Sequence, residues 1–216
     1  MPEVREREEV LDGQPVRWFE ADGEPGRAPV LYLHGVPMSG REWRAFLEVT
    51  GGLAPDLPGF GRSGKRADLP YDLPFYAGWI QRFLEQRGVQ RVRLVAHDWG
   101  VGLGLAWAQE RPDAVERLVL ADGAPLLPGY RWHRLARLWR TPLVGELVMG
   151  ASTPWTLRQL SRHANRRRGP MPPEWQEIVQ EGWDLGTERA ILRLYRSSPP
   201  EALERAGARL GELRCP

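Results

Sequence analysis

The chain has 216 residues, of which 42% are hydrophobic and 27% are charged, and its formal net charge is +2. This length and composition predict one soluble domain with a modest insertion, and no apolar run approaches the roughly 20 residues of a membrane span. The single cysteine, Cys215, excludes an internal disulfide and a cysteine-based metal site. The first residues lack the apolar run of a signal peptide, so we expect a cytoplasmic protein.

Positive charge is concentrated between residues 130 and 168, where arginines alternate with tryptophan and leucine. At helical spacing this pattern favours the solvated face of amphipathic helices over a nucleic-acid-binding surface. We therefore expect partners other than nucleic acid or a membrane, and we expect no cofactor and no metal. The oligomeric state stays open.

Short apolar runs alternate with segments of helical periodicity as far as residue 121. The runs that predict strands are 10–11, 16–19, 29–33, 52–56, 91–96 and 116–121, and the helical segments are 41–48, 76–87 and 99–110. The first two strands are expected to form a hairpin around the turn signal Asp12-Gly13. The later alternation predicts an α/β fold with a mostly parallel sheet and helices on both faces. Ligands of such sheets bind at the carboxyl ends of the strands.

Beyond residue 125 the alternation stops, and the chain predicts several helices that carry tryptophans, namely Trp132, Trp139, Trp155, Trp175 and Trp183. We interpret residues 1–124 as the core and residues 125–200 as a helical lid, or cap. Within the final segment, 201–216, residues 203–213 are predicted to form the helix that returns from the lid.

The segment Ala96-His97-Asp98-Trp99-Gly100 joins a predicted strand directly to a predicted helix. Small residues on both sides of a central polar residue are typical of a nucleophile elbow, because the turn is sharp and the helix packs close to the strand. The central residue is usually serine, but here it is Asp98. A carboxylate needs no base to deprotonate it and can attack a saturated carbon to form an ester. Taken alone, the pattern is equally explained by Asp98 as a helix N-cap.

A second motif, His34-Gly35-Val36-Pro37, follows an earlier strand. Backbone N–H groups beside its glycine can turn toward a developing negative charge. Val36 and Trp99 would then donate a pair of backbone amides.

A third motif, residues 56–64, contains Gly59, Gly61 and Gly64 at the spacing of a dinucleotide-binding loop. That fingerprint requires a helix that opens directly from the strand, with the third glycine inside it. A loop, residues 65–70, follows instead. The sequence therefore argues against a Rossmann fold.

In this order and at these distances, residues 34–37, 56–63 and 96–100 resemble the haloalkane dehalogenase and epoxide hydrolase branch of the α/β-hydrolase superfamily. The resemblance covers residues 25–125 well and the lid only loosely. It implies that Asp98 displaces a halide or opens an epoxide, and that a later histidine activates water against the resulting ester.

The resemblance also implies roles for three other residues, and a fourth departs from the family. Trp99 matches the tryptophan whose indole N–H helps to hold the leaving halide, although epoxide hydrolases carry it too. Asp122 occupies the place of the acid that orients the histidine in some dehalogenases, while Asp122-Gly123 is equally a turn signal. Tyr195 resembles one of two lid tyrosines that protonate the epoxide oxygen, or is simply a buried lid tyrosine. Val36 departs from the asparagine that binds halide in one set of dehalogenases.

None of the four histidines is predicted to be the base. His97 should diverge from its neighbour in the elbow, and His34 should belong to the scaffold of the oxyanion loop. His133 and His163 fall among lid arginines, as surface residues do.

Residues 213–216 resemble the approach to the next core strand of the superfamily, so the resemblance implies that the last core strands and the histidine are missing from this sequence. Three hypotheses stay open. The first is a hydrolase that acts on a small apolar substrate and water, foremost a haloalkane dehalogenase and alternatively an epoxide hydrolase. The second is a truncated protein without turnover that binds apolar ligands. The third is an ester hydrolase, which the aspartate disfavours.

Overall fold

The computed structural model describes residues 2–124, 126–152, 156 and 172–216. Within these residues six strands form one sheet, in the order β1-β2-β4-β3-β5-β6. The strands are β1 (Arg5–Leu11), β2 (Gln14–Ala21), β3 (Val30–Leu33), β4 (Gly52–Pro55), β5 (Val92–His97) and β6 (Val115–Ala121). The four strands β3 to β6 are parallel, and β1 and β2 are antiparallel to their neighbours. The prediction of a mostly parallel α/β sheet is confirmed.

The opening hairpin is confirmed as well. Asp12 and Gly13 form its two-residue turn with φ angles of 54° and 70°, and Leu11 pairs with Gln14 on either side. Two consecutive positive φ angles match the twist of the flanking strands, and aspartate followed by glycine tolerates them better than most pairs.

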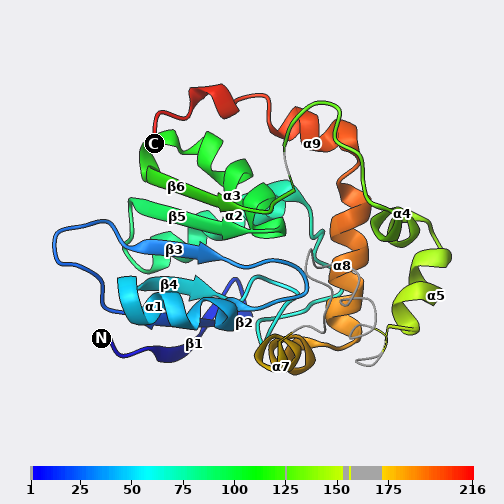
Figure 1. Ribbon diagram of the computed structural model, residues 1–216, viewed down its shortest axis with the longest axis horizontal. Helices are drawn as coiled ribbons and strands as arrows, with labels where there is room; N and C mark the ends of the chain where they lie inside the picture. The colour runs from blue at the N-terminus through cyan, green and yellow to red at the C-terminus, as the bar shows by residue number, and fades with distance from the viewer. Residues whose placement is uncertain (1, 125, 153–155, 157–171) are drawn as a thin grey trace.

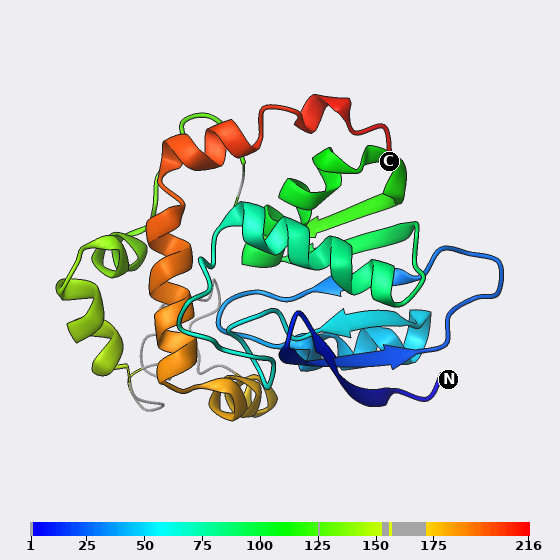
Figure 2. The ribbon, with the colours of Figure 1, turned by 180° about the vertical axis from the view of Figure 1, so that it is seen from behind.

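Helices cover both faces of the sheet, as predicted (Figures 1 and 2). The first face carries a 3₁₀ turn, η1 (Gly40–Trp43), followed by α1 (Arg44–Thr50), and the second face carries α2 (Leu73–Gln86) and α3 (Trp99–Glu110). A short 3₁₀ turn, η2 (Pro112–Ala114), leads from α3 into β6. Sequence periodicity placed the start of α2 at residue 76, three residues too late, because it overlooked Asp72, whose side chain accepts a hydrogen bond from the Phe75 N–H and caps the helix.

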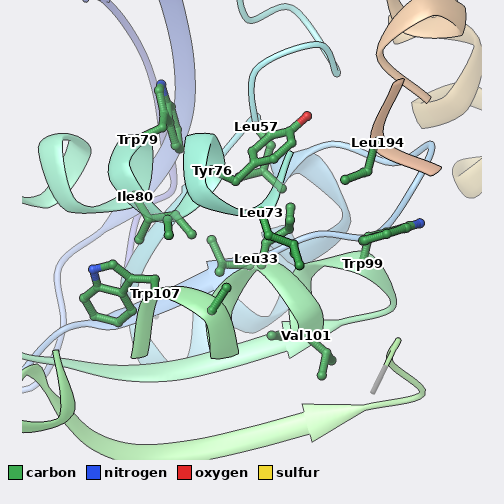
Figure 3. Packing of buried hydrophobic residues seen from close by; sticks show 14 of the residues in the cluster. Leu33, Leu57, Leu73, Tyr76, Trp79, Ile80, Trp99, Val101, Trp107 and Leu194 are labelled. Carbon is green, nitrogen blue, oxygen red and sulfur yellow. The ribbon is translucent and has the colours of Figure 1, made fainter. Parts of the chain in front are cut away.

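The larger core lies between the sheet and the pair α2 and α3. Leu33, Ile80 and Trp107 meet there, as Figure 3 shows, and each is at most 1% exposed. Burying a large apolar side chain of this kind stabilises a fold by roughly 1.5–3 kcal/mol. A smaller core, which includes Tyr32 and Leu47, lies under α1. The two cores fix the sheet from both sides and leave its strand ends free to present a site.

In the part of this region that the structure describes, four helices lie beyond the carboxyl ends of the parallel strands (Figure 1). We refer to α4 (Arg134–Arg140), α5 (Val144–Gly150), α7 (Pro173–Gly182) and α8 (Leu185–Ser197) as the outer helices. Figures 1 and 2 show that α8 runs across the direction of the strands, facing their ends. Within the described part of the chain, no helix is long and apolar enough to span a membrane.

Charged groups attach α7 to the core. The guanidinium of Arg17, which is 1% exposed, donates to the Asp56 carboxylate at 2.7 Å and to Glu181 of α7 at 2.5 Å. Arg41 binds the other oxygen of Glu181 at 3.2 Å. We call these four residues the ion-pair cluster.

The prediction of one helix over residues 203–213 is wrong. The helix α9 spans Pro200–Ala206, and only a 3₁₀ turn, η3 (Leu210–Glu212), follows it. Gly207 ends α9 where the chain packs tightly, since a Cβ there would lie 1.8 Å from the carbonyl oxygen of Leu126. Glycine is also about 1 kcal/mol less favourable than alanine inside a helix. Further on, the carbonyl of Pro216 accepts a hydrogen bond from the N–H of Leu118 in β6, at 3.0 Å.

Candidate active site

Asp98 stands in the tight turn between β5 and α3. Its φ and ψ angles are 49° and −120°, a conformation that a residue with a side chain adopts only under strain. A Cβ on Gly100 would lie 2.4 Å from the Leu33 carbonyl oxygen, and one on Gly35 would lie 2.7 Å from the Cβ of Asp98. The neighbours of Asp98 must therefore be small, as the geometry of an elbow requires. Asp98 does occupy the N-cap position of α3, but its side chain makes no capping hydrogen bond, so capping does not explain the aspartate.

Backbone N–H groups face the Asp98 carboxylate. The N–H of Val36 donates to Oδ2 at 2.8 Å, and the N–H of Trp99 also acts on the carboxylate. Burial raises the pKa of Asp98 above its ordinary value, against these two donors and the charge of His97, while the charge of Asp122 adds to the rise. The two amides that the sequence singled out thus lie together at the nucleophile candidate.

The indole of Trp99 is buried beside Asp98, with 1% of its surface exposed. Figure 3 shows Trp99 at the start of α3, below Leu194 of α8. Among the described residues no acceptor meets the Trp99 Nε1–H at both the distance and the angle of a hydrogen bond, although the indole lies close enough to the Tyr195 hydroxyl to act on its pKa. A buried donor without a partner is costly, so its presence marks a place where a ligand can accept a hydrogen bond.

Aromatic rings from the outer helices and the segment before α4 surround Trp99. The Trp132 ring stacks on it with 5.3 Å between centroids, and the Tyr195 ring meets it edge-on at 5.1 Å. The rings of Tyr130 and Trp139 extend the group at 5.0 Å from Trp132 and Tyr195, respectively. We call these five residues the aromatic cluster. It makes the surroundings of the Trp99 indole apolar.

Two tyrosine hydroxyls of this cluster lie within electrostatic reach of Asp98. Burial raises the pKa of Tyr195, and the charge of Asp98 adds to the rise, with the Trp99 indole acting in the opposite direction. Burial and Asp98 also raise the pKa of Tyr130. Both hydroxyls therefore keep their protons at neutral pH. The sequence pointed to Tyr195 but not to Tyr130, which no motif marks.

Asp122 is exposed and follows the end of β6. The backbone of Asp98 is bonded to the same loop, since its N–H donates to the Ala121 carbonyl at 3.1 Å and its carbonyl accepts from the Ala124 N–H at 3.2 Å. Asp122 is close enough for its charge to act on both Asp98 and His97. The structure thus brings the two predicted carboxylates to one edge of the sheet.

The described histidines are bound to other groups. His34 is fully buried, accepts a hydrogen bond from the Leu57 N–H at Nε2 and has its pKa lowered by burial to about 4, so it is a neutral part of the loop scaffold. His97 binds Glu42, and the exposed His133 accepts from the Ala136 N–H at the start of α4. His163, like Trp155, lies outside the described residues.

The motif at residues 56–64 is structural. Asp56 accepts hydrogen bonds from the N–H groups of Gly40 and Arg62 as well as from Arg17, and the Ser63 hydroxyl accepts from the Arg17 N–H. Gly61 has a positive φ of 53°, and a Cβ there would lie within 2.1 Å of the Asp56 carboxylate. The glycine spacing therefore serves a tight loop around a buried carboxylate.

No group of three His, Cys, Asp or Glu side chains is placed to hold a metal ion among the residues that the structure describes.

Residues 28–166 match the α/β-hydrolase fold family, and the chain belongs to this family. It is 40% identical over 171 residues to a haloalkane dehalogenase of Bradyrhizobium diazoefficiens, a match that covers 70% of this chain and 55% of the relative. It is 35% identical to a haloalkane dehalogenase of Mycolicibacterium paratuberculosis, covering 88% of this chain and 64% of that one. The chain thus spans little more than half to just under two thirds of these relatives.

The crystal structure of DBJA superposes with a TM-score of 0.75 at 27% identity, covering 99% of this chain and 79% of that one. The haloalkane dehalogenase DbeA from Bradyrhizobium elkani superposes with a TM-score of 0.74 at 24% identity, covering 97% of this chain and 72% of that one, and supports the fold alone. The predicted fold and the predicted resemblance to the haloalkane dehalogenase branch are confirmed.

Proposed function

We propose that this chain carries the nucleophile of a dehalogenase-like hydrolase, in which Asp98 attacks the carbon atom of a small haloalkane. A carboxylate oxygen forms a bond to that carbon, the carbon–halogen bond breaks, and the halide leaves with the bonding electrons. The product is an alkyl ester of Asp98. The observation that carries the proposal is a buried, strained carboxylate held by the Val36 N–H beside the unpartnered indole N–H of Trp99.

Each neighbour has a part in this step. The Trp99 Nε1–H would donate a hydrogen bond to the halide as it gains charge, at a place where the donor already waits without an acceptor. The aromatic cluster would exclude water and accommodate the apolar chain of the substrate. The outer helices would then act as the lid over the core, which is how we interpret the segment that begins at residue 125.

Release of the product needs water to attack the ester, and that step requires a general base. His34, His97 and His133 each bind other groups, so the proposal assigns the base to none of them. Asp122 would orient a base or stabilise its charge from the end of β6. Whether the ester turns over is therefore a separate question from whether it forms.

Epoxide opening is the second candidate, because a specific observation favours it. The protonated hydroxyls of Tyr130 and Tyr195 both lie within electrostatic reach of Asp98, where they could donate protons to the oxygen of an opening ring. The similarity to haloalkane dehalogenases supports halide displacement as the first candidate.

The test is to incubate the chain with 1-bromobutane, and separately with an aliphatic epoxide, and to follow the intact mass and the release of bromide. We expect the mass of one butyl group on Asp98 and at least one equivalent of bromide. Asp98→Asn should abolish the adduct, while Asp113→Asn, in η2 at the other end of α3, should leave it unchanged. Equal adduct formation by Asp98→Asn would refute the nucleophile.

The same experiment separates turnover from a single reaction. Bromide release that continues beyond one equivalent supports a working hydrolase. Release that stops at one equivalent, with the adduct intact, supports a protein without turnover.

A further inference from the structure

His97, the residue immediately before the nucleophile candidate, is paired with a buried carboxylate. Its Nδ1 lies 2.9 Å from Oε1 of Glu42 in η1, and the Glu42 side chain is only 4% exposed. No described group donates to the second oxygen of Glu42. No motif in the sequence marked this pair, which has no part in the reaction as described so far.

The His97–Glu42 pair lies on the face of the sheet that α1 covers. Side chains alternate along β5, so His97 points to the same face of the sheet as Val95, which packs against the core under α1. On that face the His97 ring also meets the Trp175 ring of α7, at 6.3 Å. Glu42, α7 and the sheet thus hold the imidazole in place next to the elbow.

The charges around His97 favour its protonated form. The hydrogen bond to Glu42 is the main cause that raises the pKa of His97, and the charges of Asp98 and Asp122 add to it, against partial burial. His34 also faces the pair and is neutral. The His97 ring thus has three carboxyl groups around it, and each of them favours its protonated form.

Asp98 in turn needs a cation nearby. It is buried beside aromatic rings, and the charge of Asp122 disfavours a second anion at this edge of the sheet. Three groups favour the ionised form of Asp98. They are the charge of His97 and the backbone N–H groups of Val36 and Trp99. The chain thus sets a charged residue directly beside the one residue that must stay ionised to react.

We propose that Glu42 holds His97 as a cation behind the elbow, so that the imidazolium favours the ionised form of Asp98. Both are positioning residues, and this inference rests on the proposed role of Asp98 as nucleophile. The functional consequence is a reaction that stays active at lower pH than a buried carboxylate would otherwise allow.

Each link can be measured by NMR titration of the full chain labelled with ¹³C in aspartate and histidine. His97→Gln should raise the pKa of Asp98 by about half to one pH unit, which is the order expected for the loss of one partly screened charge. His97→Asn is a second variant with the same expected direction. Glu42→Gln, which keeps a hydrogen-bonding group of the same size, should lower the pKa of His97 below the ordinary value. Glu48→Gln, which removes a partly exposed charge in α1, should change neither pKa.

The pH profile of alkylation by 1-bromobutane distinguishes charge from mere packing. The acid limb of the rate should move to higher pH in His97→Gln, while the rate at high pH stays within about twofold of the wild type. A uniform loss of rate at all pH values, or an unchanged pKa of Asp98 in both His97 variants, would overturn the inference. Failure of the wild type to form an adduct would instead refute the proposed function, and the NMR titration would still report on the His97–Asp98 link.

Discussion

The ion-pair cluster and the aromatic cluster attach the outer helices to the core by opposite means. The first uses four charged side chains, centred on the buried Arg17 and Asp56, to bind α7. The second uses stacked rings around Trp99 and Tyr195, and the indole N–H groups of Trp99 and Trp139 lack partners. Paired charges fix a position, whereas an apolar surface with free donors can accommodate a ligand. Under the proposed function, the first cluster anchors α7 and the second surrounds the substrate.

The largest effect on stability is expected from breaking the ion-pair cluster. Arg17→Met should lower the free energy of unfolding by about 3–5 kcal/mol, because it leaves Asp56 as a buried carboxylate without its cation. Denaturant unfolding measures the loss. Arg41→Met, which removes a partly exposed partner of Glu181, should cost less than about 1 kcal/mol. Equal losses in the two variants would contradict the assignment of Arg17 as the centre of the cluster.

A smaller loss is expected from the aromatic cluster. Trp132→Leu removes a ring that stacks on Trp99 and a hydrogen bond from its indole to the Ser198 carbonyl, and should cost about 2 kcal/mol. Trp175→Leu, at a ring that is 39% exposed, should cost less than about 1 kcal/mol. Both are measured by thermal unfolding. An unchanged melting temperature in Trp132→Leu would show that this ring contributes little to the stability of the aromatic cluster.

The ion-pair cluster should also respond to acid. Burial acts to raise the pKa of Glu181, but hydrogen bonds and charges from Arg17 and Arg41 outweigh it and leave the pKa lowered. The stability that Glu181 contributes is therefore present above its unfolded pKa near 4.5 and is lost as the pH falls through the folded value. Between pH 6 and pH 3 the wild type should lose more stability than Glu181→Gln in urea unfolding. Equal losses in the wild type and in Glu181→Gln would show that the ion pairs of Glu181 add nothing to stability.

The smallest change in stability is expected for Tyr195→Phe, which keeps the ring contacts of the aromatic cluster and removes one hydroxyl. The cost should be below about 1 kcal/mol. Alkylation by 1-bromobutane should be unchanged, whereas adduct formation with an epoxide should fall at least about tenfold if the hydroxyl donates a proton to the ring oxygen. A large loss with the bromoalkane would place Tyr195 in both reactions.

The sequence predicted the parts of the molecule that depend on local signals. The hairpin followed from Asp12-Gly13, and the elbow followed from small residues on either side of Asp98, because both are conformations of a few consecutive residues. The helix predicted over 203–213 failed because a tertiary contact of Gly207 decides where α9 ends.

Long-range pairing explains what the sequence could not supply. The sequence predicts only that Arg17 belongs to a strand. Its burial depends on Asp56 and on Glu181, which lies 164 positions away in the chain. Glu42 likewise falls in the predicted helical segment 41–48, and it lies 55 positions from His97 in the chain. Charged side chains carry no periodic signature of burial, so only the folded chain shows which of them meet.

The left-handed backbone conformation of Asp98 makes aspartate an unfavourable residue for stability at this position. Glycine at this position would relieve strain of about 1–3 kcal/mol and would remove an anion from an apolar environment. Selection for folding stability alone would therefore favour glycine over aspartate at position 98. Under the role proposed for Asp98, the protein keeps a reactive residue at a cost in stability, and stabilising substitutions at the elbow should abolish the reaction.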